Sequence, residues 1–134
     1  APPRPVTGEG LGYASALSQD GRRVAAAGRD SAVQIWPLDG GDPVPLAGSA
    51  PGDLPLQWTQ DDRTLFVAVR QGQSCRLDAI DIATGRRSLF REIEPADRAG
   101  LLDIDFFLLS ADQRAYVYSY RRILSVLYQV DGLL

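Results

Sequence analysis

The sequence contains no lysine, histidine, methionine or asparagine, and it has a single cysteine, Cys75. Without histidine, the chain cannot build a Ser-His-Asp triad, a Cys-His pair or an imidazole metal site. Without lysine, it can form neither a Schiff base nor a P-loop. A lone cysteine excludes an intrachain disulfide, and the lack of asparagine excludes N-glycosylation sequons. Because these residue types are missing, we expect a chain that is not an enzyme and that binds no cofactor.

The chain also lacks an excess of positive charge and any long apolar run. Its 14 basic residues are all arginine, and 17 acidic residues bring the net charge to -3. We therefore expect no nucleic-acid partner, because such binding depends on a basic surface. No run of about 18 apolar residues occurs, so we expect no membrane insertion. With 134 residues, 45% of them hydrophobic, the chain has the material for one folded domain.

Three segments of the chain align without a gap, at residues 18–29, 59–70 and 110–121. Each begins with Ser or Thr, has Asp at its third position and ends with Arg. The starts, Ser18, Thr59 and Ser110, are 41 and 51 residues apart, a period typical of β-propeller blades.

The start of each repeat has the chemistry of a tight turn. In the first repeat, the Asp can accept hydrogen bonds from backbone amides ahead of it, and Gly21 adopts positive φ at little cost. Asp62 and Gln113 stand where Gly21 stands, so we expect turns in the second and third repeats that are either costlier or differently shaped.

Short segments rich in β-branched, aromatic and small residues predict the strands around these turns. First strands are expected at residues 14–17, 56–58 and 104–109, and second strands at 24–28, 65–69 and 116–120. Third strands are expected at 33–36, 77–82 and 127–130, and outer strands at 43–47 and 88–93. In the middle unit, the third strand lies further from the start of the repeat than in the other two units, which predicts a longer second turn around Gly72.

These elements predict an all-β fold, a partial β-propeller of three four-stranded antiparallel blades in one segment that covers residues 1–134. The blades span residues 11–48, 54–93 and 101–134, and the last lacks its outer strand. Residues 3–8 are expected to form a spare outer strand for ring closure, because proline is tolerated on a free edge.

Three blades cannot close a ring, since propellers use about four to eight. Each uncovered blade face would cost on the order of 10 kcal/mol. We therefore expect the chain to pair with itself, as a six-bladed ring of two chains, or with the remaining blades of a parent protein. The absence of an initial Met also favours a piece of a longer chain.

The pattern Ser-x-Asp-Gly-Arg, then an apolar strand, then a third strand ending in Asp-Gly or Asp-x-x-Thr-Gly, resembles the WD40-like repeats of TolB-type β-propellers. Residues 110–134 are similar to the C-terminal propeller segment of bacterial serine/threonine protein kinases. The resemblance implies a protein-interaction or sensing module in a larger signalling protein. Two alternatives stay open: an accessory propeller of a serine hydrolase or peptidase, and a purely structural half-ring.

Asp103 and Asp105 are weak candidates for a metal site. Two residues apart on a strand, their carboxylates share one side. They can hold a cation such as Ca²⁺, act as an acid/base pair if one pKa is raised, or stand as solvated residues at a loop mouth. We favour the last interpretation.

Arg29, Arg70 and Arg121 end the three repeats and are candidate partner-binding residues. They can form a collar for an anionic ligand or a carboxylate-bearing partner. The alternative, which we favour, is a set of ion pairs between blades with the acidic residues of the Ser-x-Asp turns. The long polar loop at residues 94–100 adds further candidates for a partner contact, namely Glu94, Asp97 and Arg98.

Two more features have both a functional and a structural interpretation. The alternating Tyr116, Tyr118 and Tyr120 share one side of a strand, where we expect them to pack between blades rather than recognise a partner. For Cys75, we expect a small buried apolar residue rather than a reactive thiol.

Overall fold

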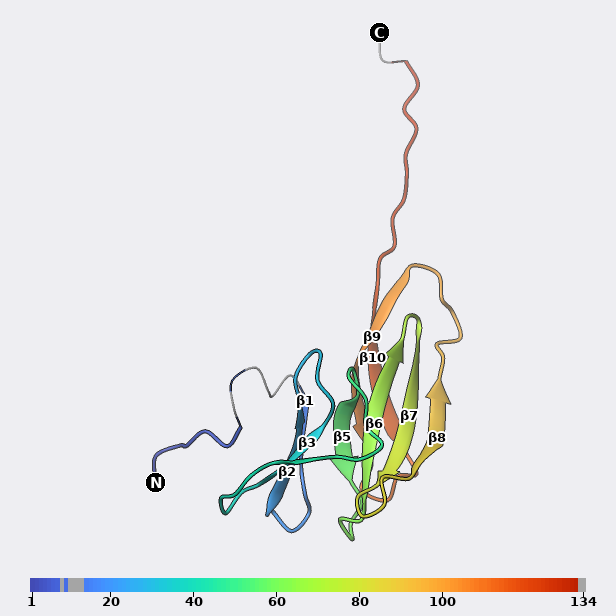
Figure 1. Ribbon diagram of the computed structural model, residues 1–134. Coiled ribbons are helices and arrows are strands. Elements are labelled where there is room, and N and C mark those ends of the chain that lie inside the picture. The colour runs from blue at the N-terminus through green and yellow to red at the C-terminus, as the bar shows by residue number, and fades with distance from the viewer. Residues whose placement is uncertain (8, 10–13, 133–134) are drawn as a thin grey trace.

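The computed structural model describes residues 1–7, 9 and 14–132. These residues form ten strands and no helix, arranged in three antiparallel sheets (Figure 1). The prediction of an all-β fold is therefore confirmed. Two of the sheets have four strands and one has two, and none of the three closes on itself. Within the described ranges, no helix could cross a bilayer.

The strands of each four-stranded sheet follow one another in chain order. The first sheet contains β1 (Ala14–Leu17), β2 (Arg23–Ala27), β3 (Gln34–Pro37) and β4 (Val44–Pro45). The second contains β5 (Leu54–Trp58), β6 (Thr64–Gln71), β7 (Ser74–Asp81) and β8 (Arg87–Ile93). A hairpin of β9 (Leu101–Leu109) and β10 (Tyr116–Arg122) is the third sheet. Each coincides or overlaps with a strand expected from the sequence.

The turn of each repeat has the same hydrogen-bond pattern. In the first, the Ser18 hydroxyl donates to the Asp20 carboxylate at 2.6 Å and accepts from the Arg23 amide at 2.9 Å. The other two turns repeat both bonds with Thr59, Asp61 and Thr64, and with Ser110, Asp112 and Ala115. The sequence repeat is therefore also a structural repeat, which closes each first hairpin locally.

The fourth position of each turn has positive φ. The angle is 69° at Gly21, 55° at Asp62 and 59° at Gln113, so two of the turns place a non-glycine residue in the left-handed region. At Asp62, the side chain offsets this cost, because its carboxylate accepts from the amides of Gln19 at 2.7 Å and Asp20 at 3.0 Å. These bonds also join the turn of the second sheet to that of the first.

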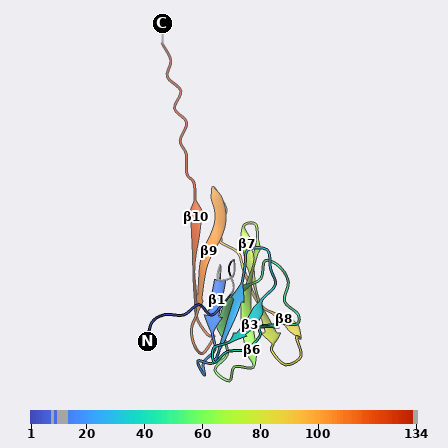
Figure 2. The ribbon, with the colours of Figure 1, turned by 60° about the vertical axis from the view of Figure 1, so that its left-hand side comes forward.

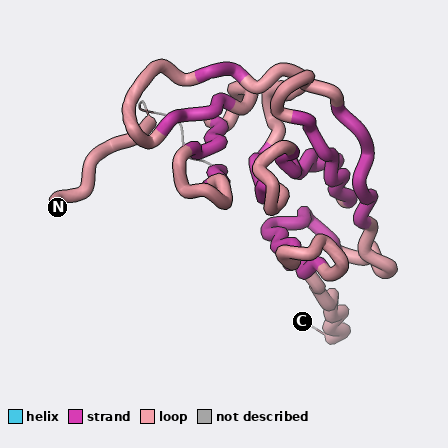
Figure 3. Tube along the Cα trace, turned by 90° about the horizontal axis from the view of Figure 1, so that it is seen from below, coloured by secondary structure: helices cyan, strands magenta, loops and turns pink. Residues whose placement is uncertain are grey.

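The sheets lie side by side, with the second sheet between the other two (Figure 3). The first strand of each sheet is next to that of the following sheet, β1 beside β5 and β5 beside β9. One core lies between the first two sheets and contains Trp58, whose Nε1 donates to the Ala16 carbonyl at 2.9 Å. A second core lies between the second sheet and the hairpin, around Leu77 and Phe107.

The tyrosine side of β10 faces this second core. The rings of Tyr116 and Tyr118 stack at 6.3 Å, and Phe107 stacks on Tyr118 at 6.2 Å. The Arg91 guanidinium lies 4.9 Å from the centre of the Tyr116 ring. Tyr118 therefore packs on the second core and Tyr116 contacts β8, whereas Tyr120 is 45% exposed and contacts only its own strand.

Three local expectations differ from the structure. Residues 127–130 form no third strand on β10, since residues 123–126 contain no Gly, Pro, Asn or Asp that would reverse the chain. Residues 3–7 belong to no sheet, while Gly8, the end of the expected spare strand, lies outside the described residues. The second turn of the middle unit is short, because Gln71 pairs with Ser74 across two residues, and the extra residues lengthen β6 and β7 instead.

Candidate partner-binding site

A groove of about 460 Å³ runs between the first strands of the sheets. Its apolar wall includes Leu54 and Leu56 from β5 and Phe106 and Leu108 from β9. Alternation along each strand brings these side chains to the same side. Arg70 and Asp105 supply charged groups to the same lining, so the groove offers apolar contacts next to a polar cluster.

That polar cluster joins β6, β9 and β10. Arg121 lies opposite Asp103 in the hairpin, and its Nη2 is 2.6 Å from Asp103 Oδ2. Its Nε is 2.8 Å from Asp105 Oδ2. A register shift between Ser119 and Tyr120 leaves Asp105 without a directly opposite residue on β10. This β-bulge allows one guanidinium to reach both carboxylates.

The ion pairs limit what Asp103 and Asp105 can do. The hydrogen bond from Arg121 lowers the pKa of the Asp103 carboxyl, whereas an acid catalyst needs a raised one. A cation would have to displace the Arg121 guanidinium. Across the described ranges of the chain, no cluster of three or more Cys, Asp or Glu side chains is placed to hold a metal ion. The two carboxylates lie within β9 and are half-buried.

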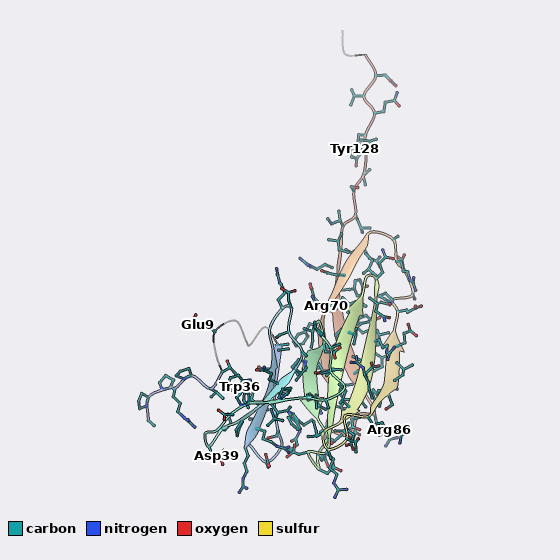
Figure 4. The ribbon with its side chains drawn as sticks, viewed as in Figure 1. Glu9, Trp36, Asp39, Arg70, Arg86 and Tyr128 are labelled. Atoms are coloured by element: carbon teal, nitrogen blue, oxygen red, sulfur yellow. The ribbon has the colours of Figure 1, made fainter. Side chains whose placement is uncertain are left out.

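The three repeated arginines follow one another along the ends of the second strands. Arg29, in the turn after β2, and Arg70 line a common pocket of about 310 Å³. Arg70 Nη2 also donates to the Asp105 carbonyl oxygen at 3.2 Å, a contact between the second sheet and the hairpin (Figure 4). Arg121 then binds the Asp105 carboxylate. The row therefore runs Arg29, Arg70, Arg121, and Asp105 connects its last two members.

The aspartates at the third positions of the repeat turns bond within their own turns, as Asp20 does with the Ser18 hydroxyl and the Arg22 amide. These turns precede the second strands, whereas the arginine row follows them. The pairing of Arg121 with Asp103 and Asp105 was missed from the sequence. The hairpin register could have revealed the pair with Asp103, which lies directly opposite Arg121, whereas the contact with Asp105 depends on the β-bulge.

The charged residues of the loop at 94–100 pair with one another and with β10. Arg98 Nη2 lies 2.7 Å from Glu94 Oε2, and Arg122 Nη1 lies 2.9 Å from Asp97 Oδ2. Hydrogen bonding from the Ala99 amide, followed by the charge of Arg122, lowers the pKa of the Asp97 carboxyl. The loop is therefore held against β10, with Glu94 and Asp97 exposed.

A second ion-pair network, missed from the sequence, is built around two buried carboxylates. Arg87 Nη1 lies 2.7 Å from Asp53 Oδ2, and Arg87 Nε lies 2.6 Å from Asp78 Oδ2. Arg76 Nε approaches the other oxygen of Asp78 at 2.6 Å. Both carboxylates are almost completely enclosed. The network ties the segment before β5 to β7 and β8, and thus stabilises the sheet that supports the groove.

Comparison with known proteins finds no family model that matches the chain and no curated protein that matches it. The site is therefore interpreted from its own chemistry, in which an apolar groove lies beside paired charges.

Proposed function

We propose that this chain is a non-catalytic interaction or sensing module built as an incomplete β-propeller. In this proposal the two four-stranded sheets are blades, and the β9–β10 hairpin is the inner half of a third. The repeated turns and the neighbouring first strands support it, because blades of a propeller repeat in sequence and place their first strands around one axis.

The observation that carries the proposal is the exposed apolar surface at the two ends of the row of sheets, a patch on the hairpin and the single side chain of Leu17 on the first sheet. Leu17 on the first sheet is 57% exposed. On the hairpin, Leu108 and its neighbour across the ladder, Val117, are 55% and 63% exposed. Exposed apolar surface of this kind marks an interaction site. The missing blades, from a second copy or from the rest of a parent protein, would cover both faces.

The groove between β1, β5 and β9 would then open on the central channel of the completed ring. Its apolar wall suits a protein segment, and Arg29 and Arg70 suit a carboxylate of that segment. This combination favours a protein partner over a small polar metabolite.

Substitutions on the open faces test the assembly. Leu17→Glu and Leu108→Glu place a charge on one face each, and Leu89→Glu is the matched control, because Leu89 is 56% exposed on the outer strand β8. Sedimentation velocity at micromolar concentration should show self-association that either face variant weakens about tenfold or more and the control leaves unchanged. A stable, monodisperse wild-type monomer of 14.5 kDa would contradict the assembly.

A further inference from the structure

The residues after β10 form a straight arm, defined here as residues 123–131. The arm continues the direction of β10 and leaves the body of the molecule (Figures 1 and 2). Tyr128 lies on it far from the sheets (Figure 4). Its apolar side chains are between 60% and 97% exposed: Ile123, Leu124, Val126, Leu127, Tyr128 and Val130. Burying these apolar side chains against another strand is more favourable in free energy than leaving them in water.

The edge of β10 that faces away from β9 is also unpaired in the described sheets. Next to the hairpin turn, the Ser110 amide donates to the Ala115 carbonyl at 2.9 Å, and at the far end the Ile123 amide donates to the Gly100 carbonyl at 2.8 Å. Odd-numbered residues of this strand therefore bond toward β9. Because backbone groups alternate along a strand, the even-numbered residues direct their N–H and C=O groups to the free edge. Such an edge is a template for another strand.

The arm does not reverse onto this edge because the residues at the reversal point oppose a tight turn. Alignment of the repeats places Ile123 and Leu124 where the β6–β7 hairpin has Gly72 and Gln73. Gly72 has a φ of 63°, which a β-branched residue such as Ile adopts only with strain. Ile123 instead extends the β9–β10 ladder through its amide.

We propose that two copies of this chain exchange their arms, so that the arm of each copy pairs with the free edge of β10 in the other. In each copy, β10 and the arm form one continuous strand over residues 116–131. A two-fold axis between residues 123 and 124 makes the two strands antiparallel, and each arm then lies along the partner's β10. The exchange is closed, so it ends at a dimer rather than a fibre.

The β6–β7 hairpin supplies the register of this pairing. Gln71 pairs with Ser74 there, which by alignment places residue 122 opposite residue 125 of the partner. Val117 then lies opposite Val130 of the partner, and Ser119 opposite Tyr128 of the partner. Since Phe106 pairs with Ser119 inside the hairpin, the partner's arm adds apolar side chains to the exposed face that contains Phe106. The exchange concerns an edge of the hairpin and does not depend on the sheets being propeller blades.

A designed disulfide tests both the pairing and its register. Val117 and Val130 of the partner occupy a pair between ladder hydrogen bonds, where Cα atoms are closest, so Val117→Cys combined with Val130→Cys should form a disulfide on oxidation. Native Cys75 is buried and does not compete. We expect a covalent dimer of 29 kDa, twice the mass of the 14.5 kDa chain. When labelled and unlabelled protein are mixed, the 117–130 link should join a labelled chain to an unlabelled one. Each single variant should lack this link.

A link inside one chain, at monomer mass, would show that the arm folds back and would overturn the proposal. Absence of the 117–130 link would overturn it as well. A third outcome is a dimer that forms without the 117–130 link and is abolished by Leu17→Glu or Leu108→Glu. This result would assign self-association to the sheet faces instead.

A second pair of variants tests the cause of the exchange. Ile123→Asn with Leu124→Gly installs a two-residue turn of the type that reverses hairpins. When it is combined with the double cysteine variant, we expect it to move the 117–130 disulfide from between chains to within one chain, so that the covalent product has the monomer mass of 14.5 kDa. The control, Val126→Asn with Leu127→Gly, makes the same change beyond the reversal point and should weaken the dimer without producing the intrachain link. A turn variant in which the 117–130 disulfide stays between chains would contradict the inference.

Discussion

Replacing Arg87 with alanine is expected to destabilise the chain far more than replacing its neighbour, Arg86. Arg87 is the centre of the buried network, and its guanidinium binds Asp53 through two nitrogens, at 2.7 and 3.0 Å. It also binds Asp78 at 2.6 Å and the Gly48 carbonyl oxygen at 3.1 Å. The Arg86 side chain, at the same end of β8, is exposed (Figure 4).

The magnitude follows from what the substitution leaves behind. Removing one partner of a buried ion pair costs about 3 to 5 kcal/mol. Asp53 would keep a hydrogen bond from the Ala50 amide, and Asp78 would keep Arg76, so we expect the lower end, about 3 kcal/mol. An exposed substitution such as Arg86→Ala costs less than about 0.5 kcal/mol. Because a domain has only about 5 to 15 kcal/mol of stability in total, the first loss is easily measured.

Urea unfolding followed by tryptophan fluorescence measures both variants, since Trp58 lies in the core beside the second sheet. The free energy of unfolding should fall by about 3 kcal/mol for Arg87→Ala and stay near the wild-type value for Arg86→Ala. Equal effects of the two substitutions, or a loss below about 1 kcal/mol for Arg87→Ala, would refute the reasoning that the buried carboxylates depend on Arg87.

The network also predicts a dependence on pH. Burial acts to raise the pKa of Asp78, but the hydrogen bonds from Arg76 and Arg87 outweigh it and leave the pKa below the ordinary value of 3.8. A carboxyl with a lowered pKa in the folded state stabilises the fold above its unfolded-state pKa, and this stabilisation is lost as the pH falls through the folded-state pKa. Wild-type stability should therefore fall below about pH 4, and less steeply in Arg87→Ala. Identical acid profiles would count against this explanation.

Two further substitutions and one reagent test other features. Gln113→Gly should stabilise the chain by about 0.5 to 1 kcal/mol, because glycine adopts the positive φ of this position without strain. Asp62→Gly should stabilise it less, because the substitution also removes the hydrogen bonds to the first turn. Equal stabilities of the two variants in thermal unfolding would show that those bonds contribute nothing. Burial raises the pKa of the Cys75 thiol to about 11, so a thiol reagent at pH 8 should label Cys75 only in denaturant, and rapid labelling of the native chain would contradict its burial.

The strands were predictable because their signals are local. The Ser-x-Asp turn and the short apolar segments around it require only neighbouring residues, and β1 was expected at its observed residues, 14–17. The strand expected at 127–130 was wrong because repeat alignment assumed a reversal that Ile123 and Leu124 do not favour. Alignment transfers a pattern, whereas a turn depends on the particular residues that form it.

The candidate site was only partly predictable, for a different reason. That Asp103 and Asp105 share a side follows from strand alternation, and both indeed reach Arg121. Their pairing with Arg121 depends on a bulge in β9, which the sequence does not mark. The Asp53–Arg87–Asp78 network joins residues that are distant along the chain, so only the packed sheets reveal it.

The turns of the three repeats also bear on how the chain folds. In each turn, the hydroxyl, the carboxylate and the backbone amides that bond to one another lie within six consecutive residues, as from Ser18 to Arg23. Each first hairpin can therefore form without help from distant segments. Isolated hairpins form in about 1 to 10 μs, whereas folds dominated by non-local pairings take about milliseconds to seconds. Three local turns along one chain therefore favour early formation of the first hairpins, with docking of the sheets as the slower step.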